Sequence, residues 1–225
     1  MEKLDKLAVQ NGLEIRQMME LAGLRMVELF NTVKIKKGSH IAIFVGKGNK
    51  GGDGLSAARH LANHGWKHIT IIMLSESISK DSRHHLQLIE KMKIPVLYFS
   101  EVRSKVSKLL ERSDIIIDSL IGYHLFGAPR GIFAQAIQEI NNAENKVIAY
   151  DLPSGAEATT GECFDPCIKA NYTLTLALPK KVFNTQSGKK YSGRVFLADI
   201  GIPEFLYKKI KATIPPWNGR GIIRV

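Results

Sequence analysis

Three aspartates and one glycine-rich loop carry the residue types in this sequence that could do acid–base chemistry on a bound ligand. The loop, VGKGNKGGDG at residues 45–54, has Gly46, Gly48 and Gly51 in the spacing G-x-G-x-x-G, between an apolar run and a helical pattern. This spacing in this context is typical of a backbone that closely approaches a dinucleotide. Gly-Asp rather than Lys-Ser/Thr follows Gly51, which excludes a P-loop. Asp53 instead puts a carboxylate where a phosphate would bind, and there it can cap the next helix.

The other two aspartates end two strands of the same predicted sheet. Asp118 ends the run DIIID, and Asp151 ends VIAYD before Leu-Pro-Ser-Gly. In a sheet of strand order 3-2-1-4-5, ligands bind outside the carboxyl ends of the strands where the order reverses. We therefore expect five side chains to converge in one crevice: Asn49, Asp53, Asp118, Asp151 and Ser154. Crowded carboxylates push their pKa values apart, which suits proton transfer.

The hydrophobic pattern predicts the strands and helices that hold these residues in place. We predict strands, some with their exit loops, at 40–46, 68–74, 95–99, 114–122, 146–155, 172–178 and 194–202. We predict helices at 12–34, 54–65, 80–92, 101–111 and 129–143. This alternation predicts an α/β, three-layer Rossmann-like fold, with a mostly parallel sheet and helices on both faces. We expect a single domain over 1–225, with an N-terminal helical extension at 1–35 and a C-terminal surface tail at 206–225.

Composition limits the classes of function that are possible but does not select one of them. The formal net charge of +11 suits either a solvated basic surface or an affinity for polyanions and phosphorylated ligands. The N-terminus lacks the apolar core of a secretory signal, and no run approaches the roughly 20 apolar residues of a membrane span. We expect a cytoplasmic protein without membrane contact, in which Cys163 and Cys167 are reduced thiols.

Four segments together resemble the YjeF N-terminal domain family, the NAD(P)H-hydrate epimerases. They are GKGNKGGDGLSAARHL, IIDSLIGYHLFGAPRG, VIAYDLPSG, and LTLALPKK leading to SGRVFLADIGIP, and the likeness spans about residues 12–205. The resemblance implies an isomerase of nucleotide repair, which epimerises the R and S forms of hydrated NADH or NADPH without a redox cofactor. It also implies a single domain of the YjeF N-terminal type.

The resemblance implies a set of site residues. Substrate-binding positions fall on Asn49, Lys50, Gly51, Gly52, Asp53, Gly122, Tyr123, His124, Leu125, Phe126, Gly127, Ala128 and Asp151. Either Asp151 or Asp53 would shuttle the proton as the catalytic group. We favour Asp151, because a carboxylate at a strand end is held rigidly, whereas Asp53 can be occupied as a cap. Lys180 and Lys181 could reach a phosphate, but an ordinary solvated pair is the simpler interpretation.

The family's potassium site falls on Lys50, Asp118 and Ser154. Relatives usually carry NNGGD where this chain has NKGGD, and a lysine has no oxygen to offer potassium. Three interpretations stay open: potassium held by Asp118 and Ser154, an ammonium of Lys50 in place of the ion, or a site that has lost activity.

We also expect partners for this protein, and two alternative functions are considered. The resemblance implies a dehydratase that acts on the same metabolite, and we expect it to be separate because the chain stops soon after ADIGIP. The opening helix could form a homodimer. The main alternative is a non-catalytic module of this fold that binds nucleotide or RNA, or dimerises, which the charge and Lys50 would suit. An NAD-dependent oxidoreductase would need Glu76 for the ribose and a substrate domain for which the remaining chain is too short.

Overall fold

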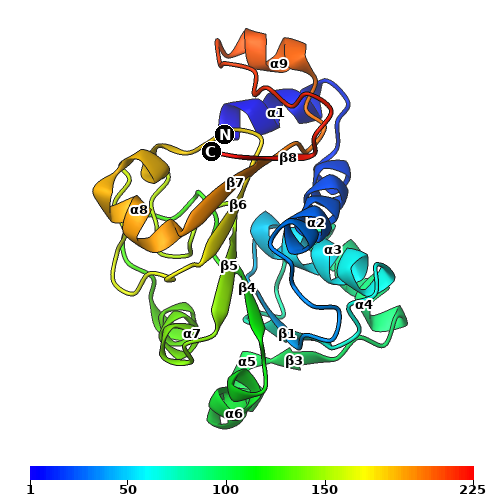
Figure 1. Ribbon diagram of the computed structural model, residues 1–225, viewed down its shortest axis with the longest axis vertical. Coiled ribbons are helices and arrows are strands. Elements are labelled where there is room, and N and C mark those ends of the chain that lie inside the picture. The colour runs from blue at the N-terminus through cyan, green and yellow to red at the C-terminus, as the bar shows by residue number, and fades with distance from the viewer.

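The computed structural model describes residues 1–225 and contains one eight-stranded sheet (Figure 1). The strand order is β3-β2-β1-β4-β5-β6-β7-β8; neighbours from β3 to β7 run parallel, and β8 is antiparallel to β7. The strands are β1 (Ile41–Val45), β2 (Ile69–Met73), β3 (Val96–Tyr98), β4 (Ile115–Ser119), β5 (Lys146–Tyr150), β6 (Tyr172–Leu176), β7 (Arg194–Ala198) and β8 (Ile222–Arg224). The predicted order 3-2-1-4-5 and the mostly parallel α/β class are confirmed.

Helices connect the strands and cover the sheet. They are α1 (Glu2–Gln10), α2 (Ile15–Thr32), α3 (Asn49–Asn63), α4 (Lys80–Lys91), α5 (Phe99–Val102), α6 (Val106–Glu111), α7 (Gly131–Asn142), α8 (Gln186–Ser192) and α9 (Glu204–Lys209), with short 3₁₀ turns at Arg103–Lys105 and Lys181–Asn184. No helix is long and apolar enough to cross a membrane.

Two hydrophobic cores lie on opposite faces of the sheet, because successive strand residues point to opposite sides. In β1, Ile41, Ile43 and Val45 join the core that includes residues of α2, α3 and α4, whereas Ala42 and Phe44 join the core with α6 and α7. An apolar run without polar alternation therefore forms a central strand covered on both faces. This arrangement holds the carboxyl ends of β1, β4 and β5 at one edge of the sheet.

Several element boundaries differ from the sequence predictions. The helix predicted at 12–34 is the single helix α2, and the N-terminal extension contains a further helix, α1, before a turn in which Gly12 has φ +93°. The helix predicted at 101–111 is three short pieces. The tail at 206–225 does more than follow the surface, because it completes α9 and supplies β8 as an edge strand.

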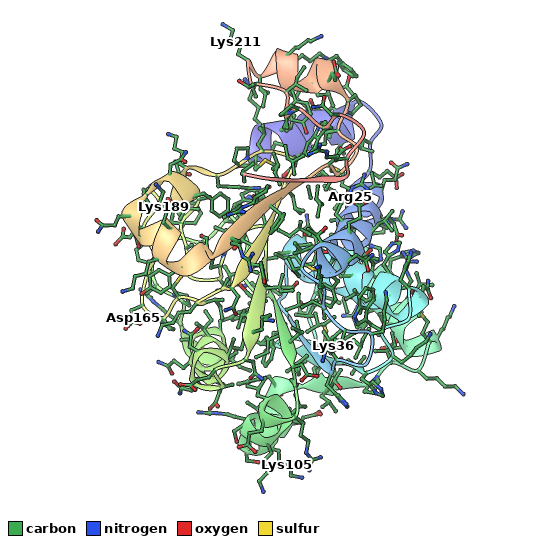
Figure 2. The ribbon with its side chains drawn as sticks, viewed as in Figure 1. Arg25, Lys36, Lys105, Asp165, Lys189 and Lys211 are labelled. Carbon is green, nitrogen blue, oxygen red and sulfur yellow. The ribbon has the colours of Figure 1, made fainter.

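Lysines of this basic chain lie in several parts of the molecule. Figure 2 labels Lys36, Lys105, Lys189 and Lys211 in separate regions of the view. The formal charge of +11 therefore gives the whole particle an attraction for anions.

Candidate active site

A cavity of about 570 Å³ lies at the carboxyl ends of the central strands. Its wall combines the loop after β1, the loop after β4, the end of β5, and residues of α1 and α2. Ten of the predicted site residues line it: Asn49, Lys50, Asp53, Gly122, Tyr123, His124, Leu125, Phe126, Ala128 and Asp151. Five others lie outside its lining: Gly51, Gly52, Gly127, Asp118 and Ser154. The predicted convergence is thus observed for three loops, with Asp118 and Ser154 buried beneath the floor.

Close packing explains the glycines of the loop after β1. A Cβ at Gly46 would lie 1.8 Å from the carbonyl oxygen of Leu120, and one at Gly51 would lie 2.2 Å from the oxygen of Gly46. Gly48 has open space around its Cα and is the residue that precedes α3. A side chain at Gly46 would block the approach of the loop after β4, and one at Gly51 would clash within the loop after β1. At Gly48 the backbone is open to a ligand.

Asp53 is not a helix cap, so that prediction is wrong. The helix α3 begins at Asn49 with Gly48 as the preceding residue, and no side chain caps it. Asp53 consequently lies a full turn inside the helix, where its carboxyl lines the cavity while only 8% of the residue is exposed. Burial and the negative charges of Asp151 and Asp5 raise the pKa of Asp53 well above its ordinary value. The raised pKa favours the protonated form of this carboxyl.

Asp151 is held in an unusual backbone conformation at the end of β5. Its φ is +60°, and the amide of Leu152 donates to the carbonyl of Tyr150 at 2.6 Å, which closes a three-residue turn. Aspartate tolerates this left-handed region better than most residues. The turn directs the carboxylate toward β6, where it accepts a hydrogen bond from the amide of Leu176 at 3.2 Å.

Lys180 is part of this site, not a member of a solvated pair. It is 6% exposed, and its ammonium is ion-paired with Asp151. The same nitrogen donates to Thr175 Oγ1 at 3.1 Å and to the carbonyl of Leu176 at 2.8 Å. Lys181 alone is exposed. The place of Lys180 shortly after β6, at the same edge as Asp151, is the signal that could have identified it.

Lys50 fills a cage of oxygen atoms beneath the cavity floor. Its Nζ donates to Asp118 Oδ2 at 3.1 Å, to Ser154 Oγ at 2.9 Å, and to two main-chain carbonyls, of Ile121 at 3.0 Å and Leu152 at 2.8 Å. The carboxylate and both carbonyls can only accept, and they surround the nitrogen. Burial lowers the pKa of Lys50 and the carboxylate of Asp118 opposes this. Because a neutral amine would turn a lone pair toward an oxygen, the cage requires the ammonium.

Asp118 and Ser154 form the rest of the cage. Asp118 is fully buried, and besides Lys50 it accepts from the amide of Ser154 at 2.8 Å, the hydroxyl of Ser154 at 2.6 Å and the amide of Leu120 at 3.1 Å. Every lone-pair direction of this carboxylate is engaged. Asp118 therefore joins the loops after β1, β4 and β5, and it does not face the cavity.

The helix α1 contributes a site residue that sequence reasoning missed. Asp5 lines the cavity and accepts a hydrogen bond from the hydroxyl of Tyr123 at 2.7 Å, which joins α1 to the loop after β4. Burial raises the pKa of Asp5, and the hydrogen bond from Tyr123 opposes this. Two exposed cations, Lys47 and Arg130, also line the cavity. The cavity therefore offers three carboxyl groups inside and positive charge at its rim.

The family model YjeF_N, described as YjeF-related protein N-terminus, matches residues 15–182. A bifunctional NAD(P)H-hydrate repair enzyme Nnr from Moorella thermoacetica is 41% identical over 84% of this chain, which spans 37% of that relative's length. An NAD(P)H-hydrate epimerase from Dehalogenimonas lykanthroporepellens is 36% identical over 93% of this chain and 82% of its own length.

The fold also has a close structural neighbour. The crystal structure of the yeast protein ynu0 superposes with a TM-score of 0.85 over 100% of this chain and 96% of the yeast chain, at 23% sequence identity. A likeness at that identity supports the fold alone.

Proposed function

The chain belongs to the YjeF_N family, and on that premise we propose that it is an NAD(P)H-hydrate epimerase. The reaction would interconvert the R and S forms of hydrated NADH or NADPH. The observation that carries the proposal is the meeting of Asp53, with its raised pKa, and Asp151, with its cationic partner, in one cavity. A non-catalytic RNA-binding module is not favoured, because the matched relatives are named as epimerases or repair enzymes.

The proposed chemistry breaks and reforms the bond between C6 of the nicotinamide ring and its hydroxyl oxygen. Asp53 in its acid form donates a proton to the hydroxyl, which departs as water while the lone pair of ring nitrogen N1 forms an N1=C6 iminium. Water then adds to the opposite face of C6 and returns a proton to a carboxylate. Such positioned acid–base help is typically worth about 10²- to 10⁴-fold in rate.

Asp151 has the complementary role in this proposal. Asp151 is ion-paired with Lys180, and in this proposal it would accept the proton from the adding water and offer negative charge to the cationic iminium. This division assigns the acid to Asp53 and the base to Asp151. It rests on the two environments rather than on the rigidity of the strand end.

Cations at the rim would bind the dinucleotide's pyrophosphate. Lys47 and Arg130 are exposed and line the cavity on the loops after β1 and β4. Guanidinium and ammonium groups form charge-assisted hydrogen bonds with phosphate oxygens. Placing the pyrophosphate there leaves the nicotinamide ring for the acidic interior.

We further propose that the ammonium of Lys50 takes the role that the family resemblance assigns to potassium. Four oxygens lie 2.8 to 3.1 Å from Nζ, so the residues present do not fit a potassium ion at the same point. The tethered cation would neutralise Asp118 and hold the three loops together without an exchangeable ion. Potassium held by Asp118 and Ser154 alone would have to displace Lys50 from the cage.

The metabolic partner would be a dehydratase that acts on one epimer of the same hydrated nucleotide. The bifunctional relatives are consistent with such a pairing, and the chain covers only part of their length. The homodimer stays a prediction.

A coupled assay tests the proposed reaction. R-hydrated NADH is incubated with an excess of a dehydratase specific for the S form, and NADH recovery is followed with and without this protein. We expect acceleration by the wild type, and a loss of about 10²-fold or more in Asp53→Asn and in Asp151→Asn. Glu90→Gln, an exposed carboxylate on α4 outside the cavity, is the matched control and should keep full activity. Full activity in both aspartate variants would refute the assignment of the acids.

A further inference from the structure

A second cavity lies at the opposite end of the parallel strands from the active site. It has a volume of about 540 Å³ and is bounded by the segment after α2, the first residues of β6 and β7, and the edge strand β8, the red strand beside β7 in Figure 1. The active site occupies the carboxyl ends of the parallel strands, whereas Tyr172 and Arg194 are the first residues of β6 and β7. The two cavities share no lining residue.

Four cations line this second cavity, and no carboxylate side chain does. They are Lys34, Arg194, Arg220 and Arg224, and all are exposed. None of them takes part in an ion pair of the protein. Two acids from adjoining elements, Glu28 of α2 and Asp199 after β7, are paired with Arg25 instead. The concentration of unpaired positive charge is therefore not balanced by the protein itself.

The aromatic side chains and the arginines of the second cavity provide different contacts for a ligand. Tyr172 and Phe196 are 6% and 7% exposed, and the guanidinium of Arg194 lies over the ring of Tyr172 and donates to its hydroxyl at 2.8 Å. Both rings are therefore nearly buried, and Arg194 covers that of Tyr172, which leaves little area for stacking a base. Lys34 follows the carboxyl-terminal end of α2 and offsets the partial negative charge there. The three arginines remain for an external anion.

We propose that this cavity is a second ligand site that binds a small phosphorylated anion. Arginine presents a planar fork that matches the geometry of a phosphate group, and several forks around one hollow suit one or two phosphates. The volume lies within the roughly 300–1,000 Å³ typical of small-molecule sites. A hollow bounded by only ten residues favours a small anion over a long polyanion, which needs an extended basic track.

Inorganic pyrophosphate is the probe, titrated into the full chain by isothermal calorimetry. The double variant Arg220→Gln/Arg224→Gln removes two arginines of the site. Two matched variants remove the same number of charges elsewhere: Lys105→Gln/Lys108→Gln on the exposed surface near α6, and Lys47→Gln/Arg130→Gln at the active-site rim. We expect the wild type to bind pyrophosphate. Its affinity should fall at least about tenfold, or about 1.4 kcal/mol, in the arginine variant alone.

Five results would overturn the proposal. Three come from pyrophosphate binding to the wild type and the control variants: no binding to the wild type at millimolar pyrophosphate, equal weakening in the surface variant, or loss confined to the rim variant. The fourth is a folded arginine variant that keeps wild-type affinity, and the fifth is far tighter, length-dependent binding of single-stranded RNA that requires Arg220 and Arg224. Circular dichroism of each variant separates lost binding from lost folding.

Discussion

At the scale of single residues, buried charges determine what the crevice can do. Lys50 and Lys180 each bring an ammonium to an aspartate, at Asp118 and Asp151, whereas Asp53 has no such partner. Removing one member of a buried ion pair leaves an uncompensated charge, which typically costs about 3–5 kcal/mol. An unpaired buried carboxyl instead keeps its proton. Asp53 therefore differs from the ion-paired Asp118 and Asp151, because burial raises its pKa and no ammonium pairs with it.

Asp53 makes a prediction about stability as a function of pH. Its pKa in the folded protein is raised, so between the unfolded value, about 3.9, and the folded value the native state binds more protons than the unfolded state. The free energy of unfolding then falls as pH rises through that window. We expect Asp53→Asn to be more stable than the wild type at neutral pH, with a difference that shrinks as pH approaches the unfolded value.

Urea unfolding at several pH values measures this difference. Glu90→Gln provides the control, since its exposed carboxyl on α4 should give no pH-dependent gain. A stability difference for Asp53→Asn that is constant across the pH range would contradict the raised pKa.

At the scale of elements, α1 closes the cavity although it lies before the matched residues 15–182. Leu4 and Ala8 are fully buried, so the helix is held by the core as well as by the bond from Tyr123 to Asp5. A helix anchored in this way positions the loop after β4, which supplies much of the predicted substrate contact.

This docking predicts a binding defect when the polar link is removed. Asp5→Ala should raise KM by about tenfold, since hydrogen bonds to charged groups contribute roughly 1.5–3 kcal/mol when well made. Steady-state kinetics on hydrated NADH measure it, and Glu2→Ala, exposed on the same helix, is the matched control. An unchanged KM in Asp5→Ala would show that α1 packs beside the site without shaping it.

Sequence reasoning succeeded where local pattern decides the structure and failed where tertiary contacts do. Continuous apolar runs predicted the central strands and their order, and strand-end acids predicted the crevice. The burial of Lys180 could not be read from ALPKK, because only the fold brings Asp151 beside it. Likewise Gly48 rather than Asp53 precedes α3, since the glycines of that loop form the first helical turn. The strand β8 was missed because its three residues follow a proline- and glycine-rich tail.

At the scale of the whole molecule, charge and topology work together. The net charge of +11 attracts a dinucleotide that carries several phosphates, while the acidic interior of the crevice suits a cationic intermediate. The crevice lies at the carboxyl ends of the parallel strands, and the basic cavity lies beside the first residues of β6 and β7. A polyanion would be attracted by the same net charge, so affinity for RNA alone does not distinguish the functions; turnover does.

The most direct test is the rate of epimerisation of R-hydrated NADH as a function of potassium, for the wild type and for Lys50→Asn. With the ammonium of Lys50 in the cage, the wild type should turn over in potassium-free buffer and respond little to added potassium. Lys50→Asn introduces the residue that the family resemblance implies at this position and should make turnover depend on potassium. Wild-type turnover that rises steeply with potassium would contradict the tethered cation, and no turnover above the spontaneous rate at any concentration would contradict the epimerase itself.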